Sequence, residues 1–137
     1  MLKVKTYLEV SPVHGIGVYA GENIPYGTIV WEFNPYVDLV YTPEQWSAIE
    51  AGVSCQSMEV MRRYSYKEKG RYYLCLDNAQ FMNHSQDNYN LINNKKNNTM
   101  HAEKDISKGD ELLCNYYEYS DSDDIHLQCL NREKNNN

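Results

Sequence analysis

At 137 residues the chain is long enough for one domain with a substantial core, and its net charge is −6. This acidic balance argues against direct nucleic-acid binding, since duplex-binding domains usually carry a basic face. No apolar run is long enough for a signal peptide or a membrane span, so we expect a soluble intracellular protein without a membrane partner.

The four cysteines are widely spaced, and no two of them form a Cys-x-x-Cys pair. This spacing predicts no zinc site or other metal site, and it favours a reducing compartment over a disulfide scaffold. Eight carboxylates against two lysines lie between Glu103 and Asp124. Such a stretch is typical of a solvated surface and is compatible with a cationic partner.

Alternating apolar side chains predict a strand over residues 3–10. Gly15 and Gly17 follow in a turn, where glycine permits positive φ and close backbone approach. Two further short strands are predicted over residues 17–20 and 28–33, separated by a turn at Pro25-Tyr26-Gly27. The first quarter of the chain is therefore predicted to be β structure.

The next segment carries strong helix signals. Thr42 as N-cap, Pro43 at the first helical position and Gln45 in a capping box predict a helix in which Trp46 faces inward. A second helical piece is predicted over residues 54–63.

The remaining elements are mainly strands. A Tyr-rich strand is predicted over residues 71–76, a core segment over residues 74–82, and a hairpin over 91–102. A last strand is predicted over 112–116, before a short helix over 125–130. The fold class predicted from these elements is mainly β with short helices.

Polar residues follow the core segment directly in the stretch Phe81-Met82-Asn83-His84-Ser85. Asn offers an acceptor and an amide donor, and neutral His offers one of each. Such a pair either holds a polar ligand or caps a turn.

Three stretches in register resemble the SET domain family of protein lysine methyltransferases. They are residues 11–20 around the glycine turn, residues 81–85, and residues 105–116, which end in Tyr116. The resemblance is to compact members, such as those of some viruses and bacteria, without flanking zinc modules. It implies a β-clip fold with a threaded C-terminal segment. It also implies a single SET domain over 1–137, with a core at about 11–119, a variable insert at about 41–70 and an acidic tail at 120–137.

The resemblance implies an S-adenosylmethionine-dependent protein-lysine N-methyltransferase that releases S-adenosylhomocysteine, with Tyr116 as the catalytic residue. The cofactor-binding residues implied are His14, Gly15, Ile16, Gly17, Asn83, His84 and Tyr116. The substrate-channel residues implied are Tyr72, Tyr73, Cys114 and Tyr119. Many relatives carry Phe or Tyr at the position of Cys114, so this smaller residue predicts addition of more than one methyl group.

We expect the partner to be a protein with a basic lysine-containing segment, such as a histone or histone-like tail. The compartment expected is the cytoplasm, or the nucleus of a host cell if the source is a virus or an effector. Because zinc modules are absent, either residues 125–130 or the second subunit of a homodimer is expected to close the channel.

Two departures from the family pattern keep an alternative open. Gln80 stands where the family carries an arginine before the central motif, and Gln86-Asp87-Asn88-Tyr89 replaces the usual Cys-x-Pro-Asn. These changes motivate a catalytically inactive SET-fold binding module as the second hypothesis. A cysteine hydrolase using Cys75 and His84 is a third, but no nucleophile turn or orienting partner marks it.

Overall fold

The computed structural model describes residues 1–135. Its strands are β1 (Thr6–Val10), β2 (Ile16–Ala20), β3 (Ile29–Glu32), β4 (Asp38–Tyr41), β5 (Ser65–Glu68), β6 (Arg71–Cys75), β7 (Asn83–His84), β8 (Leu91–Asn94), β9 (Thr99–Ala102) and β10 (Leu113–Cys114). Its helices are α1 (Pro43–Gly52), α2 (Cys55–Tyr64) and α3 (Ile125–Asn135), with 3-10 turns η1 (Asn78–Phe81) and η2 (Tyr116–Glu118). The prediction of a mainly β fold with short helices is confirmed.

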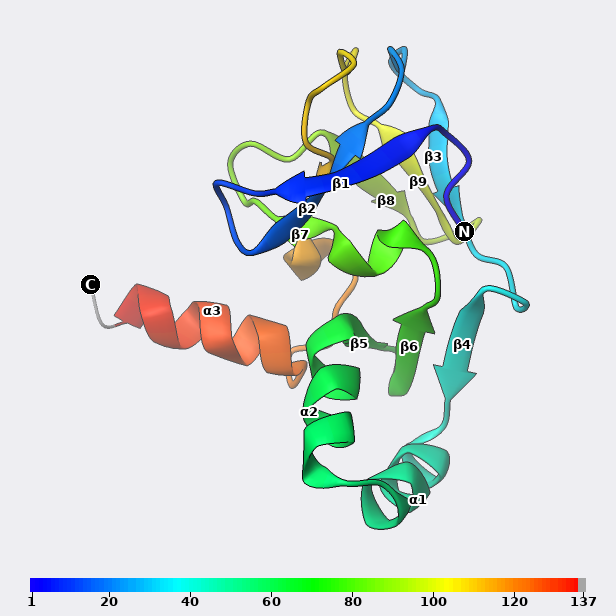
Figure 1. The fold of residues 1–137 in the computed structure, drawn as a ribbon, viewed down its shortest axis with the longest axis vertical. Helices are drawn as coiled ribbons and strands as arrows, with labels where there is room; N and C mark the ends of the chain where they lie inside the picture. Colours follow the sequence, from blue (N-terminus) through cyan, green and yellow to red (C-terminus); the bar gives the residue numbers. More distant parts are fainter. Residues whose placement is uncertain (136–137) are drawn as a thin grey trace.

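The strands form three small sheets, of which the five-stranded sheet positions the site. Its order is β3-β9-β8-β10-β7, so the late strand β10 lies between two earlier ones and runs parallel to both. β3, β9 and β8 are labelled side by side in Figure 1. Leu113 is paired with Asn83, and Cys114 with His84. This pairing brings the central and closing motifs side by side, although they are far apart in sequence.

The other two sheets flank this arrangement. β1 and β2 form an antiparallel hairpin with Val10 opposite Ile16; Gly15 lies in the turn between them, and Gly17 lies in β2 opposite Glu9. The order β4-β6-β5 forms the third sheet, and α1 and α2 lie at its far end (Figure 1). Residues 41–70 therefore form one end of the molecule.

The main core lies between the first hairpin and the five-stranded sheet. Its centre is filled by side chains with at most 1 % of their surface exposed. Most are β-branched or aliphatic residues, which pack well in strands. They are Val18, Ala20, Ile24, Val30, Leu91, Ala102 and Leu112.

Local helix signals are confirmed. Thr42 and Gln45 form the reciprocal capping box in front of Pro43, and Trp46 is buried. The second predicted helix is α2, capped by Ser54, with Met58 buried. Both helices begin where side-chain oxygens satisfy free backbone N–H groups.

Two predicted strand ends are wrong. The strand predicted over residues 112–116 ends at Cys114, because Asn115 caps the 3-10 turn that starts at Tyr116 by accepting from Tyr117 N. The strand predicted over residues 71–76 ends at Cys75, and Asp77 then caps η1 in the same way. In the core segment that follows, Ala79 and Met82 are buried. Asn and Asp side chains compete with strand pairing by accepting local backbone hydrogen bonds.

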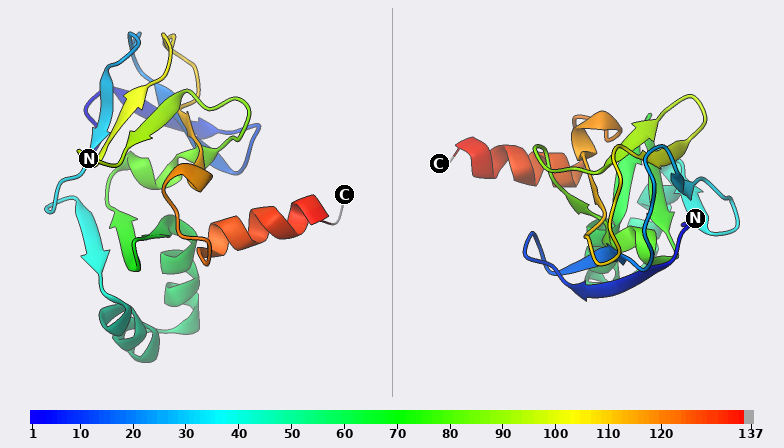
Figure 2. Two further views of the ribbon diagram at one scale, coloured as in Figure 1. Left: turned by 180° about the vertical axis from the view of Figure 1, so that it is seen from behind. Right: turned by 90° about the horizontal axis from the view of Figure 1, so that it is seen from above.

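Most of the segment predicted as an acidic C-terminal tail is helical. The helix predicted over residues 125–130 is confirmed and continues to Asn135 as α3, which projects from the body (Figures 1 and 2). Asp124 is buried and accepts from Lys67 N and His126 N, which fixes the start of α3 on β5. The end of the predicted tail, Asn136 and Asn137, lies outside the described residues. No helix among residues 1–135 is long and apolar enough to cross a membrane.

Candidate functional site

Asn83 ties the glycine turn to the rest of the site. It is buried, and its Nδ2 lies 3.0 Å from the His14 carbonyl oxygen, 3.2 Å from that of Ile16 and 2.9 Å from Glu111 Oε1. All three partners are acceptors, so the Asn83 nitrogen faces them and its Oδ1 remains available as an acceptor. The structure therefore brings the turn and the central motif together.

Glu111 braces the same turn from the closing motif. Its Oε2 accepts from Ser11 Oγ at 2.9 Å, and Ser11 Oγ in turn accepts from Val13 N at 2.9 Å. The carboxylate lies so close to Gly17 that a Cβ added there would come 2.1 Å from Oε1. Gly17 is thus required by close approach, because any side chain would displace the carboxylate.

Tyr116 starts η2 directly beside β7. Its hydroxyl donates to the Met82 carbonyl oxygen at 2.7 Å, and its backbone N donates to His84 Nδ1 at 3.1 Å. Burial raises the pKa of Tyr116 far above its usual range, so its phenol stays neutral. Because its proton points at Met82, the lone pairs of the oxygen are free on the other side.

His84 is held neutral by the same arrangement. Since Nδ1 accepts from Tyr116 N, the ring proton of the neutral form is on Nε2. Burial lowers the pKa of His84, and the charge of Lys134 lowers it further, against an opposing backbone hydrogen bond at Cys114. The ring also lies against Tyr116, with centroids 5.1 Å apart.

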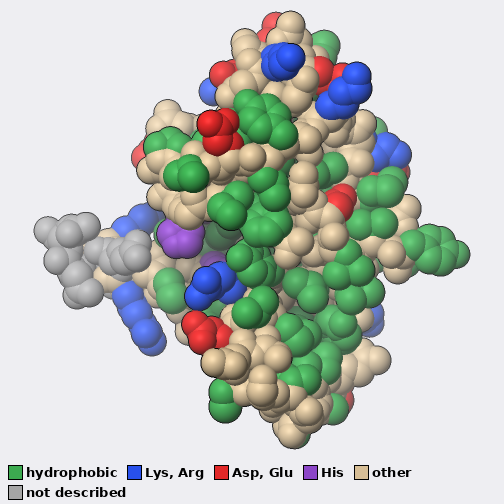
Figure 3. Space-filling view, viewed as in Figure 1, with side chains coloured by type: hydrophobic (Ala, Val, Ile, Leu, Met, Phe, Trp, Pro, Cys, Tyr) green, Lys and Arg blue, Asp and Glu red, His purple; other side chains and the backbone are tan. Residues whose placement is uncertain are grey.

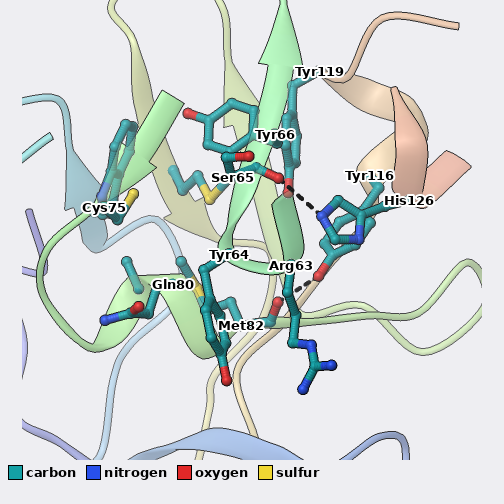
Figure 4. A pocket seen from close by; sticks show the side chains of 13 residues that line it. Arg63, Tyr64, Ser65, Tyr66, Cys75, Gln80, Met82, Tyr116, Tyr119 and His126 are labelled. Atoms are coloured by element: carbon teal, nitrogen blue, oxygen red, sulfur yellow. Dashed lines mark hydrogen bonds between the residues drawn. The ribbon is translucent and has the colours of Figure 1, made fainter. Parts of the chain in front are cut away.

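A narrow cavity of about 60 Å³ opens beside Tyr116 (Figure 4), and we call it the aromatic cavity. Its walls are mainly apolar or aromatic and include Trp31, Tyr66, Met82, Met100, Tyr116 and Tyr119. Burial raises the pKa values of Tyr66 and Tyr119 well above their usual range, so these walls carry no anionic phenol. Such a slot suits an aliphatic stem that ends in an amine or a methylated cation.

A second cavity of about 260 Å³ lies between the glycine turn, β7 and α3, and we call it the turn cavity. Its walls include Val13, His14, Asn83, His84, Cys129 and Leu130. Histidine side chains (purple) are visible near the base of the C-terminal helix in Figure 3. This cavity offers polar groups along one side and apolar groups along the other.

Tyr116 and His126 line both cavities. His126 comes from α3, and its Nε2 lies 2.9 Å from the Ser65 carbonyl oxygen on β5. Because a carbonyl only accepts, Nε2 carries a proton. Two ligands, one in each cavity, would therefore meet at Tyr116, with α3 of the same chain closing one side.

The structure separates the four residues assigned to the channel. Tyr119 lines the aromatic cavity, and Cys114 lies buried behind it, with Sγ 3.4 Å from the Tyr119 hydroxyl. Burial raises the pKa of Cys114 to about 12, so its thiol is neutral. Among the described residues, the cavity walls include neither Cys114, Tyr72 nor Tyr73.

Strand alternation explains where the two neighbouring tyrosines lie. Tyr72 stacks on Trp46 of α1 with ring centroids 4.5 Å apart. Tyr73 points to the opposite face and stacks on Tyr66 at 5.1 Å, so it supports a cavity wall from behind. From this sheet Ser65, Tyr66 and Cys75 line the cavity, and Tyr66, which sequence reasoning missed, supplies the aromatic ring.

His126, Arg63 and Cys129 are further wall residues that sequence reasoning missed. They lie on predicted helices, but helical periodicity does not reveal what a helix packs against. The only sequence signal for His126 was its place within the segment expected to close the channel.

Most carboxylates of the acidic stretch accept hydrogen bonds from other residues of the protein. Of the eight carboxylates between Glu103 and Asp124, seven accept hydrogen bonds within the described chain, mostly from backbone N–H groups. Asp121, for example, accepts from Lys69 N and Gly70 N in the β5–β6 turn. These carboxylates hold loops in place in addition to carrying charge.

The comparisons with known proteins agree on one family. The SET domain model matches residues 15–117. Among solved structures, CpSET8 from Cryptosporidium is 26 % identical, with TM-score 0.54 over 81 % of this chain and 56 % of that chain. The Neurospora histone lysine methyltransferase DIM-5 is 20 % identical, with TM-score 0.55 over 84 % and 53 %.

The extent of coverage varies among these relatives. A candidate histone methyltransferase from Plasmodium falciparum is 24 % identical, with TM-score 0.54 over 84 % of this chain and 95 % of that chain. The chain spans only about half of DIM-5 and CpSET8. No curated protein sequence matches the chain. Because the family model covers most of the chain and the solved structures share its mainly β fold, the protein belongs to the SET domain family.

Proposed function

We propose that the protein is an S-adenosylmethionine-dependent protein-lysine N-methyltransferase. The observation that carries the proposal is the meeting of the turn cavity and the aromatic cavity at Tyr116. Methyl transfer needs a donor and an acceptor in line, and two cavities that share the wall residues Tyr116 and His126 support such an arrangement.

The turn cavity fits the amino-acid end of the cofactor. Asn83 Oδ1 is left as an acceptor by the three contacts of its nitrogen, so it is available to an α-ammonium group. His14 and His84 line the same cavity, and Cys129 and Leu130 supply an apolar side from α3. When bound, S-adenosylmethionine supplies an already activated methyl group on its sulfonium.

The aromatic cavity fits the lysine. A free lysine has a pKa of about 10.4, so its charge must be lost before it attacks. Burial among Tyr66, Tyr119 and Trp31, beside a cationic sulfonium, disfavours the ammonium by desolvation and by like-charge repulsion. Tyr116 stays neutral, and its free lone pairs can accept weak C–H···O contacts from the methyl group.

We further propose a basic lysine-containing protein segment as substrate, a histone or histone-like tail being one form. Two of the similar solved structures, from Neurospora and Plasmodium, are described as histone methyltransferases or candidates for that activity. The net charge of −6 supports a cationic partner, and screening should weaken the preference as salt rises.

An inactive SET-fold binding module is the second candidate, favoured by the uncharged Gln80 in the wall of the aromatic cavity. Incubation with methyl-labelled S-adenosylmethionine and a mixture of basic proteins separates the two. The enzyme should label protein, and Tyr116→Phe should reduce the labelling severely because it removes the hydroxyl at the meeting point. Cofactor binding without any label transfer from the wild type would instead support the binding module.

A further inference from the structure

S-adenosylmethionine carries a carboxylate at its amino-acid end, and a partly buried carboxylate requires a cation or several hydrogen-bond donors. Among the described residues that line either cavity, Arg63 is the only lysine or arginine. It stands close to the end of α2, in the wall that also contains Gln80, Met82 and Tyr116. A permanent positive charge is therefore present at the site.

The position of Arg63 within the cavity suits this role. In Figure 4 its side chain extends on the side of Met82 and Tyr116 and points away from Cys75. That side is where the aromatic cavity meets the turn cavity, since Tyr116 and His126 belong to both. The opposite end of the cavity is apolar and includes Cys75.

The guanidinium of Arg63 is free to take a new partner. It has one ion pair, with Glu59 one turn earlier on the same helix, at 3.3 Å. The two side chains are 60 % and 71 % exposed, and exposed pairs of this kind hold their partners weakly. Exchange of Glu59 for a ligand carboxylate would therefore cost little.

The neighbouring cations are engaged elsewhere. Arg62 pairs with Glu50 at 2.8 Å and faces the other side of α2. Lys134 lies 4.8 Å above the Tyr117 ring and bonds to Gln86. Gln80, at the position where relatives carry arginine, is uncharged, and its amide donates to the Asp77 carbonyl oxygen at 3.3 Å. We propose that Arg63, supplied by the insert, binds the cofactor carboxylate in place of a cation at position 80.

This inference rests on the proposed function, and calorimetry distinguishes the two. The ligands are S-adenosylhomocysteine and its decarboxylated analogue, which differ only in the carboxylate. The wild type should bind the carboxylate form at least about tenfold more tightly, as expected for a charge-assisted hydrogen bond. Arg63→Gln should remove most of this preference, and Arg63→Lys, which keeps the charge but not the planar fork, should retain part of it.

Arg62→Gln is the matched control, since it removes a neighbouring exposed arginine and should leave the preference unchanged. Thermal unfolding of each variant shows whether the fold is intact. Two results would overturn the inference: full carboxylate preference in Arg63→Gln, or loss of the preference in Lys134→Gln alone. Either result would leave the proposed function standing. Failure of the folded wild type to bind S-adenosylhomocysteine would overturn both.

Discussion

Replacing Gly17 by alanine is the sharpest structural test of the glycine turn. The added Cβ would come 2.1 Å from Glu111 Oε1 and 3.1 Å from Ser11 Cβ. Glu111 is the end of a flexible side chain, but Ser11 and Asn83 hold both of its oxygens. The methyl group must therefore push the carboxylate out of this network.

The cost follows from the two hydrogen bonds that break. Stranding a buried polar partner costs about 1–3 kcal/mol, and Asn83 and Ser11 each lose one contact. Partial relaxation reduces the sum, so we expect Gly17→Ala to lower the free energy of unfolding by about 2 kcal/mol or more. Because Asn83 loses its orientation, S-adenosylhomocysteine should bind at least about tenfold more weakly.

Denaturant unfolding and calorimetry measure the two effects, with Gly15→Ala as the control. Gly15 has φ +53°, but an added Cβ there meets nothing within 4 Å, so strain of about 1–2 kcal/mol is its only cost. Adding Glu111→Ala to Gly17→Ala should give less than the sum of the single effects, because the obstructing group is gone. Wild-type cofactor affinity in Gly17→Ala, or full additivity in the double variant, would refute the reasoning.

Three further predictions concern single residues. Since burial lowers the pKa of folded His84, the unfolded chain binds the proton first as pH falls. Its contribution to stability should be complete above about pH 6.5 and decline below, and His84→Asn should flatten that decline in denaturant unfolding. Alkylation of Cys129, in the turn cavity wall, should slow with S-adenosylhomocysteine while exposed Cys55 reacts unchanged; equal rates would contradict the cavity assignment. Tyr119→Phe, which removes the hydroxyl beside Cys114 Sγ, should shift products toward higher methylation, and an unchanged product mixture by mass spectrometry would exclude that role.

The elements that were predictable from sequence are those with local signals. The capping box at Thr42, the turn glycines and the hairpin over residues 91–102 each follow from neighbours in the chain. The ends at Asn115 and Asp77 were missed, because a capping side chain overrode the apolar run before it.

The site residues likewise fall into those with a local sequence signal and those without one. Asn83, His84 and Tyr116 stand in motifs, so the resemblance placed them together before the structure did. Glu111 precedes β10, Tyr66 lies on β5, Arg63 on α2 and His126 on α3, and the packing of these elements around the site depends on the whole fold. Long-range packing of this kind leaves no periodic signal in sequence.

The measurement that tests the central claim most directly is mass spectrometry of a basic lysine-containing peptide after incubation with S-adenosylmethionine. We predict methyl groups on the lysine Nε with the wild type, and a severe loss with Tyr116→Phe, whose fold and cofactor affinity are checked separately. A peptide that stays unmethylated by a folded wild-type protein that binds the cofactor, across a panel of basic sequences, would contradict the account.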